Sequence, residues 1–164
     1  MGAGIHGGYG FTKGYKRVYK MSESSFRRNE FTREQLLDFI RGKTQLSTEI
    51  VEKISKREIR MSILVNELFD RYFNPDRNVV GVAYGNKIYL RRDSISIHSN
   101  IVHEGTHALE FINGVSRLSI GSKEGEIRAF KAEHEFQKAA KLPLEFRNED
   151  EIRVHVWLNY KERR

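Results

Sequence analysis

The 164-residue chain contains no cysteine, and this absence narrows its chemistry. Without thiols the protein forms no disulfide and no thiolate metal site, so any metal must be held by histidine, aspartate or glutamate. The chain also lacks an apolar run of about 18 residues, the length of a membrane-spanning helix. Its first residues, 1–6, have neither the basic nor the apolar region of a secretion signal. We therefore expect no membrane span, and we expect any export to depend on a longer parent chain.

The charge of the chain is strongly positive, at +7, which raises the question of nucleic-acid binding. Its basic residues are dispersed in pairs rather than gathered in one segment, however. Dispersed charge is typical of general attraction to anions and of solubility. The pattern therefore favours an acidic partner, such as an inhibitor protein, over nucleic acid. The basic pairs are Lys16-Arg17, Arg27-Arg28, Lys56-Arg57 and Arg91-Arg92, with a further cluster in the tail at 161–164.

One segment, 101–111, contains the pattern H-E-x-x-H at His103, Glu104 and His107. Residues four apart on a helix project from one face, one turn apart, so the two imidazoles can bind one Zn²⁺. Glu104 lies about 100° around the helix from His103, which suits the general base of a metallopeptidase. Apolar neighbours predict that this helix packs into a core. Gly105 is the exception, because an interior glycine costs up to about 1 kcal/mol of helix propensity.

A zinc site that hydrolyses peptides needs a third protein ligand. The segment 122–136 predicts a second helix, with Ser122 as its N-cap. Glu126 is the preferred third ligand, since Ala129 one turn later is small enough to let the two helices approach closely. The other candidates on this segment remain open: Glu124, Glu133 and His134.

The motifs resemble those of a known family. H-E-x-x-H followed about twenty residues later by Glu-x-x-Ala is similar to the gluzincin branch of zinc metallopeptidases. The wording V-H-E-G-T-H-A-L-E-F, then E-G-E-I-R-A-F-K-A-E-H-E-F-Q, more narrowly resembles zincin-like C-terminal toxin domains of bacterial polymorphic toxin systems. The resemblance covers residues 78–140. It implies zinc ligands at His103, His107 and Glu126, and a catalytic acid/base at Glu104. It also implies secretion or delivery into a target cell as part of a larger toxin, with a cognate immunity protein as a partner.

The expected fold class is α+β, a mainly helical zincin-like domain with a small antiparallel hairpin or sheet beside the H-E-x-x-H helix. We expect a flexible glycine-rich lead at 1–25 and a single domain at 26–164. The segment after Asn148 shows both a capping box and an alternating apolar pattern, and we favour a helix. The other expected elements are a helix from Thr32 to Gly42, a longer helical stretch from Thr48 to Tyr72 with a break near 56–58, and a hairpin of 78–84 and 87–91 around Gly85-Asn86.

The hairpin and four single residues carry narrower predictions. The resemblance implies that one strand of the hairpin pairs with an extended substrate. The alternative is an ordinary antiparallel hairpin that shields the core. Tyr84 and Tyr89 are candidate donors to a developing oxyanion. Glu110 is a candidate for orienting a metal-binding imidazole, and His98 is expected at the surface.

The leading functional prediction is a zinc-dependent metallopeptidase that hydrolyses peptide bonds of a protein substrate. The alternative is a basic nucleic-acid-directed toxin or binding domain without peptidase activity. A third is a zincin-shaped interaction module without turnover.

Overall fold

The computed structural model describes residues 31–73 and 79–161, so the predicted glycine-rich lead lies outside the described residues. The elements confirm the α+β class, with helices predominating. Within the described ranges, none of the helices combines the length and apolar character needed to cross a membrane. In chain order the elements are α2 (Arg33–Ile40), α3 (Gln45–Ser55), β1 (Arg60–Leu64), α4 (Asn66–Phe73), β2 (Gly81–Tyr84), β3 (Lys87–Arg91), α5 (Ile97–Ile112), α6 (Arg117–Ile120), α7 (Lys123–Ala140) and α8 (Glu149–Asn159).

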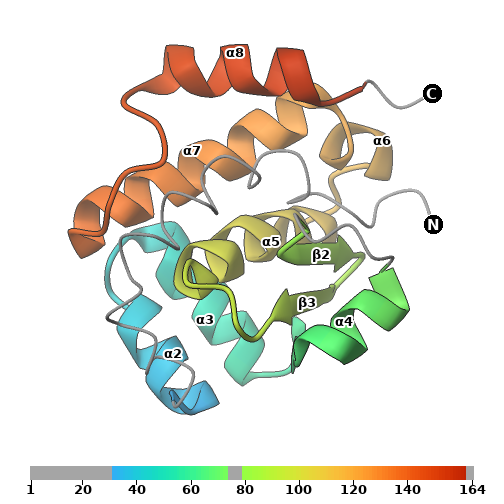
Figure 1. Ribbon diagram of the computed structural model, residues 1–164, viewed down its shortest axis with the longest axis vertical. Coiled ribbons are helices and arrows are strands. Elements are labelled where there is room, and N and C mark those ends of the chain that lie inside the picture. Colours follow the sequence, from blue (N-terminus) through green and yellow to red (C-terminus); the bar gives the residue numbers. More distant parts are fainter. Residues whose placement is uncertain (1–30, 74–78, 162–164) are drawn as a thin grey trace.

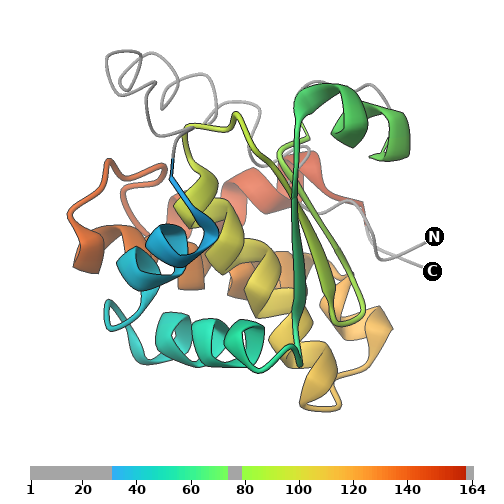
Figure 2. The ribbon, with the colours of Figure 1, turned by 90° about the horizontal axis from the view of Figure 1, so that it is seen from below.

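Helix α5 is the centre of the structure. The sheet lies on one side of it and α7 on the other, and α8 forms an outer layer over α7 (Figure 1). Helices α2 and α3 pack against α5 from a third direction, as the turned view shows (Figure 2). Thirteen consecutive residues of α5, from Ile97 to Leu109, are buried. A helix covered on nearly all sides is a rigid support for the side chains it carries.

The glycine inside α5 is explained by its contact with α3. A Cβ atom at Gly105 would lie 2.5 Å from Cγ2 of Ile50, which is fully buried. The close approach of the two helices therefore requires glycine at this position. The helix ends just before Gly114, which takes a left-handed conformation with φ of 88°.

The sheet has the strand order β1-β3-β2, with β2 and β3 antiparallel and β1 parallel to β3. The predicted hairpin is confirmed, and Gly85 in its turn has φ of 62°. The sheet is mixed rather than antiparallel, since β1 adds a parallel edge. One face, with Ala83, Ile88 and Leu90, joins the core cluster around α5. The opposite face packs against Phe69 of α4.

The predicted helical stretch from Thr48 to Tyr72 is wrong, although its predicted break is present. The segment forms α3, then β1, then α4, and Arg57 at the end of α3 has φ of 63°. The five residues of β1 continue the apolar spacing of the helices around them, so periodicity alone does not distinguish them. Their strand conformation depends on pairing with β3, which comes 23 residues or more later in the chain. Met61, within β1, is buried in the core.

The capping signals locate three helix starts correctly. Thr32 forms a complete capping box with Gln35, and Ser122 accepts a hydrogen bond from the backbone N–H of Gly125. Asn148 accepts from the N–H of Glu151, so the C-terminal segment is helical as favoured. The apolar alternation after Asn148 therefore does not mark a strand, since helix α8 buries residues four apart.

His98 corrects a second prediction. It was expected at the surface, but only 4% of the residue is exposed. Its ring lies 4.5 Å from that of Phe39 on α2, centroid to centroid, and 5.8 Å from that of Phe31. The imidazole belongs to the packing between α2 and the first turn of α5.

Candidate metal centre

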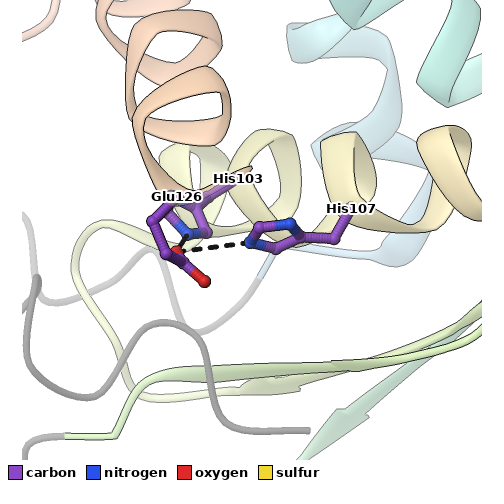
Figure 3. A group of neighbouring side chains, drawn as sticks. All are labelled: His103, His107 and Glu126. Carbon is purple, nitrogen blue, oxygen red and sulfur yellow. Dashed lines mark hydrogen bonds and ion pairs between the residues drawn. The ribbon is translucent and has the colours of Figure 1, made fainter. Parts of the chain in front are cut away.

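Three predicted ligands meet in the interior of the protein. Ligand atoms of His103, His107 and Glu126 all lie within 4.8 Å of one another. One carboxylate oxygen of Glu126, Oε1, lies 3.1 Å from Nε2 of His103 and 3.4 Å from Nε2 of His107. Figure 3 shows the two imidazoles, which lie one helical turn apart on α5. Both point toward this oxygen of Glu126, which α7 supplies. All three residues are buried, with at most 1% of each exposed.

The sequence brings α7 to this point through small residues. Ala129, one turn after Glu126, is fully buried between the helices, as predicted from its size. A Cβ atom at Gly125 would lie 2.2 Å from the carbonyl oxygen of Ile120, so the first turn of α7 packs directly on α6. This packing fixes the position of the first turn of α7. It therefore also fixes the position of Glu126 relative to the two histidines of α5.

The geometry of the three ligands suits a zinc ion. Two imidazole nitrogens and one carboxylate oxygen are a common ligand set for catalytic zinc. Tetrahedral bonds of 2.0–2.1 Å place neighbouring ligand atoms about 3.3 Å apart. The two Glu126 contacts, at 3.1 and 3.4 Å, are therefore close to the separations that such a site needs.

The charges around the site also favour a cation. Four glutamates are buried, at positions 104, 126, 133 and 145. Arg91 is the one arginine or lysine buried among the described residues, and it pairs with Asp70 at 2.6 Å. A nearby positive charge stabilises a buried carboxylate. A divalent ion held by His103, His107 and Glu126 would bring positive charge close to these glutamates.

Glu133 contacts the far side of the first histidine. Its Oε1 lies 3.0 Å from Nδ1 of His103, while Nε2 of the same ring faces Glu126. Burial is the main cause that raises the pKa of Glu133 well above its ordinary value, and the negative charges of Glu145, Glu104 and Glu126 raise it further. A carboxylate on Nδ1 fixes the tautomer that presents Nε2 to a metal.

This contact replaces the predicted one from Glu110. That side chain binds Arg128 through both oxygens, at 2.7 and 3.1 Å. The carboxylate on His103 is therefore Glu133 and not Glu110, while the orientation of His107 by Glu110, one turn away on α5, stays a prediction. Residue spacing along α5 suggested Glu110, but the partner of His103 comes from α7.

Glu133 is itself held by a buried amide. Nε2 of Gln137 donates to Oε2 of Glu133 at 3.3 Å and to the hydroxyl of Ser99 at 3.1 Å. The Oε1 of Gln137 accepts a hydrogen bond from the backbone N–H of Glu145 at 3.2 Å. The network links α5, α7 and the loop after α7, so the orientation of His103 depends on all three.

Glu104 lies against the sheet rather than against α7. Its side chain passes over Gly81 in β2, where a Cβ atom would be 2.9 Å from Cγ and 3.0 Å from Oε2 of Glu104. Glu104 is completely buried. Because β2 is an edge strand, the carboxylate sits between the ligand-bearing helix and the edge at which the resemblance implies substrate binding.

The remaining sequence candidates lie elsewhere. Glu124 is exposed and pairs with Arg153. His134 is buried, with 8% exposed, but it is not part of the ligand group. Tyr89 packs against Phe73 on the sheet face opposite α5, which argues against a role at the site. Tyr84 lies at the hairpin end, where its ring contacts the guanidinium of Arg117.

Sequence reasoning missed the roles of Glu133, Gln137 and Gly81. Glu133 follows Glu126 by seven residues, which is two helical turns, so both project from one face of α7. That spacing was a usable signal, but it does not distinguish a metal ligand from a residue that orients one. Gly81 gave no such signal, because its role depends on the pairing of β2 beside α5.

Comparison with known proteins found no family model, no curated protein and no solved structure that matches this chain. The functional argument therefore depends on the residues of the site themselves.

Proposed function

We propose that this protein is a zinc-dependent peptidase in which His103, His107 and Glu126 hold the metal. The observation that carries the proposal is the meeting of these three ligand atoms within 4.8 Å, with the carboxylate of the same motif, Glu104, buried beside β2. A zinc ion bound there would polarise a peptide carbonyl and lower the pKa of water toward neutrality.

The chain supplies the proton transfers and the orientation. The carboxylate of Glu104 takes a proton from the attacking water and later delivers it to the nitrogen of the leaving amine. Glu133 and Gln137 keep the imidazole of His103 in one orientation. The edge of β2 opposite β3, which has no strand partner in the part of the chain that the structure describes, aligns an extended substrate by backbone hydrogen bonds, so that its scissile bond lies near Glu104.

The direct test is Glu104→Gln, which preserves the size of the side chain and removes its basicity. We expect the variant to keep about one zinc per chain, as the single ligand group implies, and to lose about 10²–10⁴-fold in peptidase activity. Cleavage of a cell lysate, read by labelling of new N-termini, measures the loss. Glu124→Gln is the matched control, because this exposed glutamate lies outside the ligand group.

Two outcomes separate this proposal from its alternatives. Activity of Glu104→Gln equal to that of the unaltered chain would show that Glu104 is not the base. Chelator-independent activity on DNA or RNA, with steep salt dependence, would favour the nucleic-acid-directed alternative. The toxin setting and the immunity partner remain predictions from the family resemblance, since no contact in the described residues bears on them.

A further inference from the structure

A second feature lies away from the metal ligands. A groove of about 570 Å³ runs between α2, the end of α3 and the start of β1, and we call it the β1 groove. Its floor is apolar and includes Ile54, Ile59 and Met61, which are almost completely buried. None of the ligands is among its lining residues. Four arginines line it as well: Arg33, Arg41, Arg57 and Arg60.

One side of the groove is the edge of β1 opposite β3, which pairs with no other strand among residues 31–73 and 79–161. The N–H of Arg60 donates to Asn86, and the carbonyl of Leu64 accepts from Arg92, so alternate residues of β1 face β3. The intervening residues, Met61 and Ile63, direct their backbone groups outward. The carbonyl of Met61 accepts a hydrogen bond from Nη1 of Arg33 at 2.7 Å. This edge therefore already attracts a donor from across the groove.

Arg57 occupies a backbone conformation that is costly for it. Its φ of 63° is the left-handed conformation found after helix ends, where glycine is usual. Only one other non-glycine residue in the described ranges, Lys141, has a positive φ. Unlike Lys141, Arg57 is among the residues that line the β1 groove, where its guanidinium contributes positive charge.

The charged residues of the β1 groove indicate which kind of chain can bind along it. Arg41 already pairs with Asp38, and Arg33 contacts the carbonyl of Met61, which leaves Arg57 and Arg60 as the main cations of the rim. A second copy of this chain pairing edge to edge would place arginines against arginines. Glu34 and Asp38 also line the groove, but the four arginines outnumber them, and an acidic chain would meet complementary charge at Arg57 and Arg60 at the start of β1.

We propose that the β1 groove binds an extended acidic segment of a partner protein, added as a strand to the free edge of β1. The peptide backbone pairs with Ile63 and with Met61, where a peptide N–H takes the place of the Arg33 guanidinium at the Met61 carbonyl. An apolar side chain of the peptide enters the groove, and its carboxylates face Arg57 and Arg60. The five residues of β1 match a short peptide strand in length. This proposal rests on neither the metal nor Glu104.

Fluorescence anisotropy tests the proposal with the full chain and three labelled probes. These are a dodecapeptide in which glutamate alternates with valine and threonine, the same peptide with lysine for glutamate, and a single-stranded RNA of twelve nucleotides. We expect binding of the glutamate peptide alone, weakened by salt. Tighter binding of the RNA or of the lysine peptide would overturn the proposal.

Arg57→Gly provides a variant that separates binding from folding. Glycine relieves the backbone cost, so we expect thermal stability to stay equal or rise while affinity for the glutamate peptide falls about fivefold. Lys141→Gly is the matched control, because it relieves the same kind of cost outside the groove and should leave affinity unchanged. Equal affinity of Arg57→Gly and the unaltered chain would refute the assignment.

Hydrogen exchange locates the bound peptide. We expect slower exchange in residues 60–64 when the glutamate peptide is present, and no change in residues 81–84. Protection of 81–84 instead would place the peptide at β2, beside Glu104, and would contradict the proposal. Failure of the Glu104→Gln test, in contrast, leaves this result unaffected.

Discussion

The two sides of α5 differ in what they require of their neighbours. The side toward α3 is apolar, and Ile101, Val102 and Leu109 of α5 are buried in the main core cluster. The side toward α7 carries two buried imidazoles, each close to a carboxylate of α7. Apolar packing accepts many partners of suitable size, whereas a buried imidazole needs a particular atom at a particular nitrogen. The apolar side therefore maintains the fold, and the polar side determines the chemistry.

Two glycines make this contrast testable, because each permits a close contact of α5 or its side chains. Gly105 brings the helix against Ile50 of α3. Gly81 brings β2 against the side chain of Glu104. Adding a single methyl group at each position should affect different properties of the protein.

The largest effect is expected from Gly81→Ala. The new methyl group would meet Cγ and Oε2 of Glu104 at about 3 Å, and the flexible carboxylate would move rather than the backbone. Displacement of a catalytic group by about 1 Å costs up to about 10²-fold in rate. We expect a comparable loss of kcat with zinc content and thermal stability nearly unchanged. A variant that lost zinc or unfolded would show that Gly81 acts through the fold and not through Glu104.

Glu133→Gln should affect the metal rather than the fold. Beside a bound cation we expect Glu133 to be ionised, and the amide cannot supply the negative charge that it then presents to Nδ1 of His103. Loss of such a partner typically costs about 10–100-fold in metal affinity. Competition with a chromophoric chelator measures it. Glu110→Gln is the matched control, because Glu110 binds Arg128 and should leave the affinity unchanged. Equal affinities of the two variants would contradict the assigned role.

Gly105→Ala should affect the fold rather than the metal. Overpacking against Ile50 costs about 1–3 kcal/mol, and the better helix propensity of alanine returns up to about 1 kcal/mol. With a contact of 2.5 Å the overpacking is the larger effect, so we expect a net destabilisation of about 1 kcal/mol in urea unfolding. In the background of Ile50→Ala the same change should be neutral or stabilising. Destabilisation that persists there would exclude the contact as its cause.

The sequence predicted the parts of this structure that depend on local signals. The caps at Thr32, Ser122 and Asn148, the turn at Gly85 and the helix around H-E-x-x-H were all identified from neighbouring residues. The strand β1 was not, because its five residues form a strand only by pairing with β3.

The candidate site also has one part that local sequence signals predict and another that depends on packing between helices. The spacing within α5 placed His103 and His107 together, and the small Ala129 supported Glu126 as the third member of the group. The partner on Nδ1 of His103 depends on how α7 crosses α5. That crossing is set by packing along both helices, which residue spacing within a single helix does not describe.

The smallest expected effect is on the pH dependence of stability. Burial and neighbouring carboxylates raise the pKa of Glu133 in the folded protein above its ordinary value of 4.5. The folded state therefore holds a proton that the unfolded chain has lost. The stabilisation from this proton is complete below about pH 4.5 and disappears as pH rises through the raised pKa.

Urea unfolding of the metal-free protein over a pH series should detect this loss. We expect the free energy of unfolding to fall with rising pH more steeply in the unaltered chain than in Glu133→Gln, whose amide does not ionise. Zinc should flatten the difference, because a cation beside Glu126 offsets the charges that disfavour ionised Glu133. Parallel curves for the two metal-free proteins would mean that Glu133 is ionised in the fold. The polar side of α5 would then tolerate its buried charges without a cation, and the contrast with the apolar side would weaken.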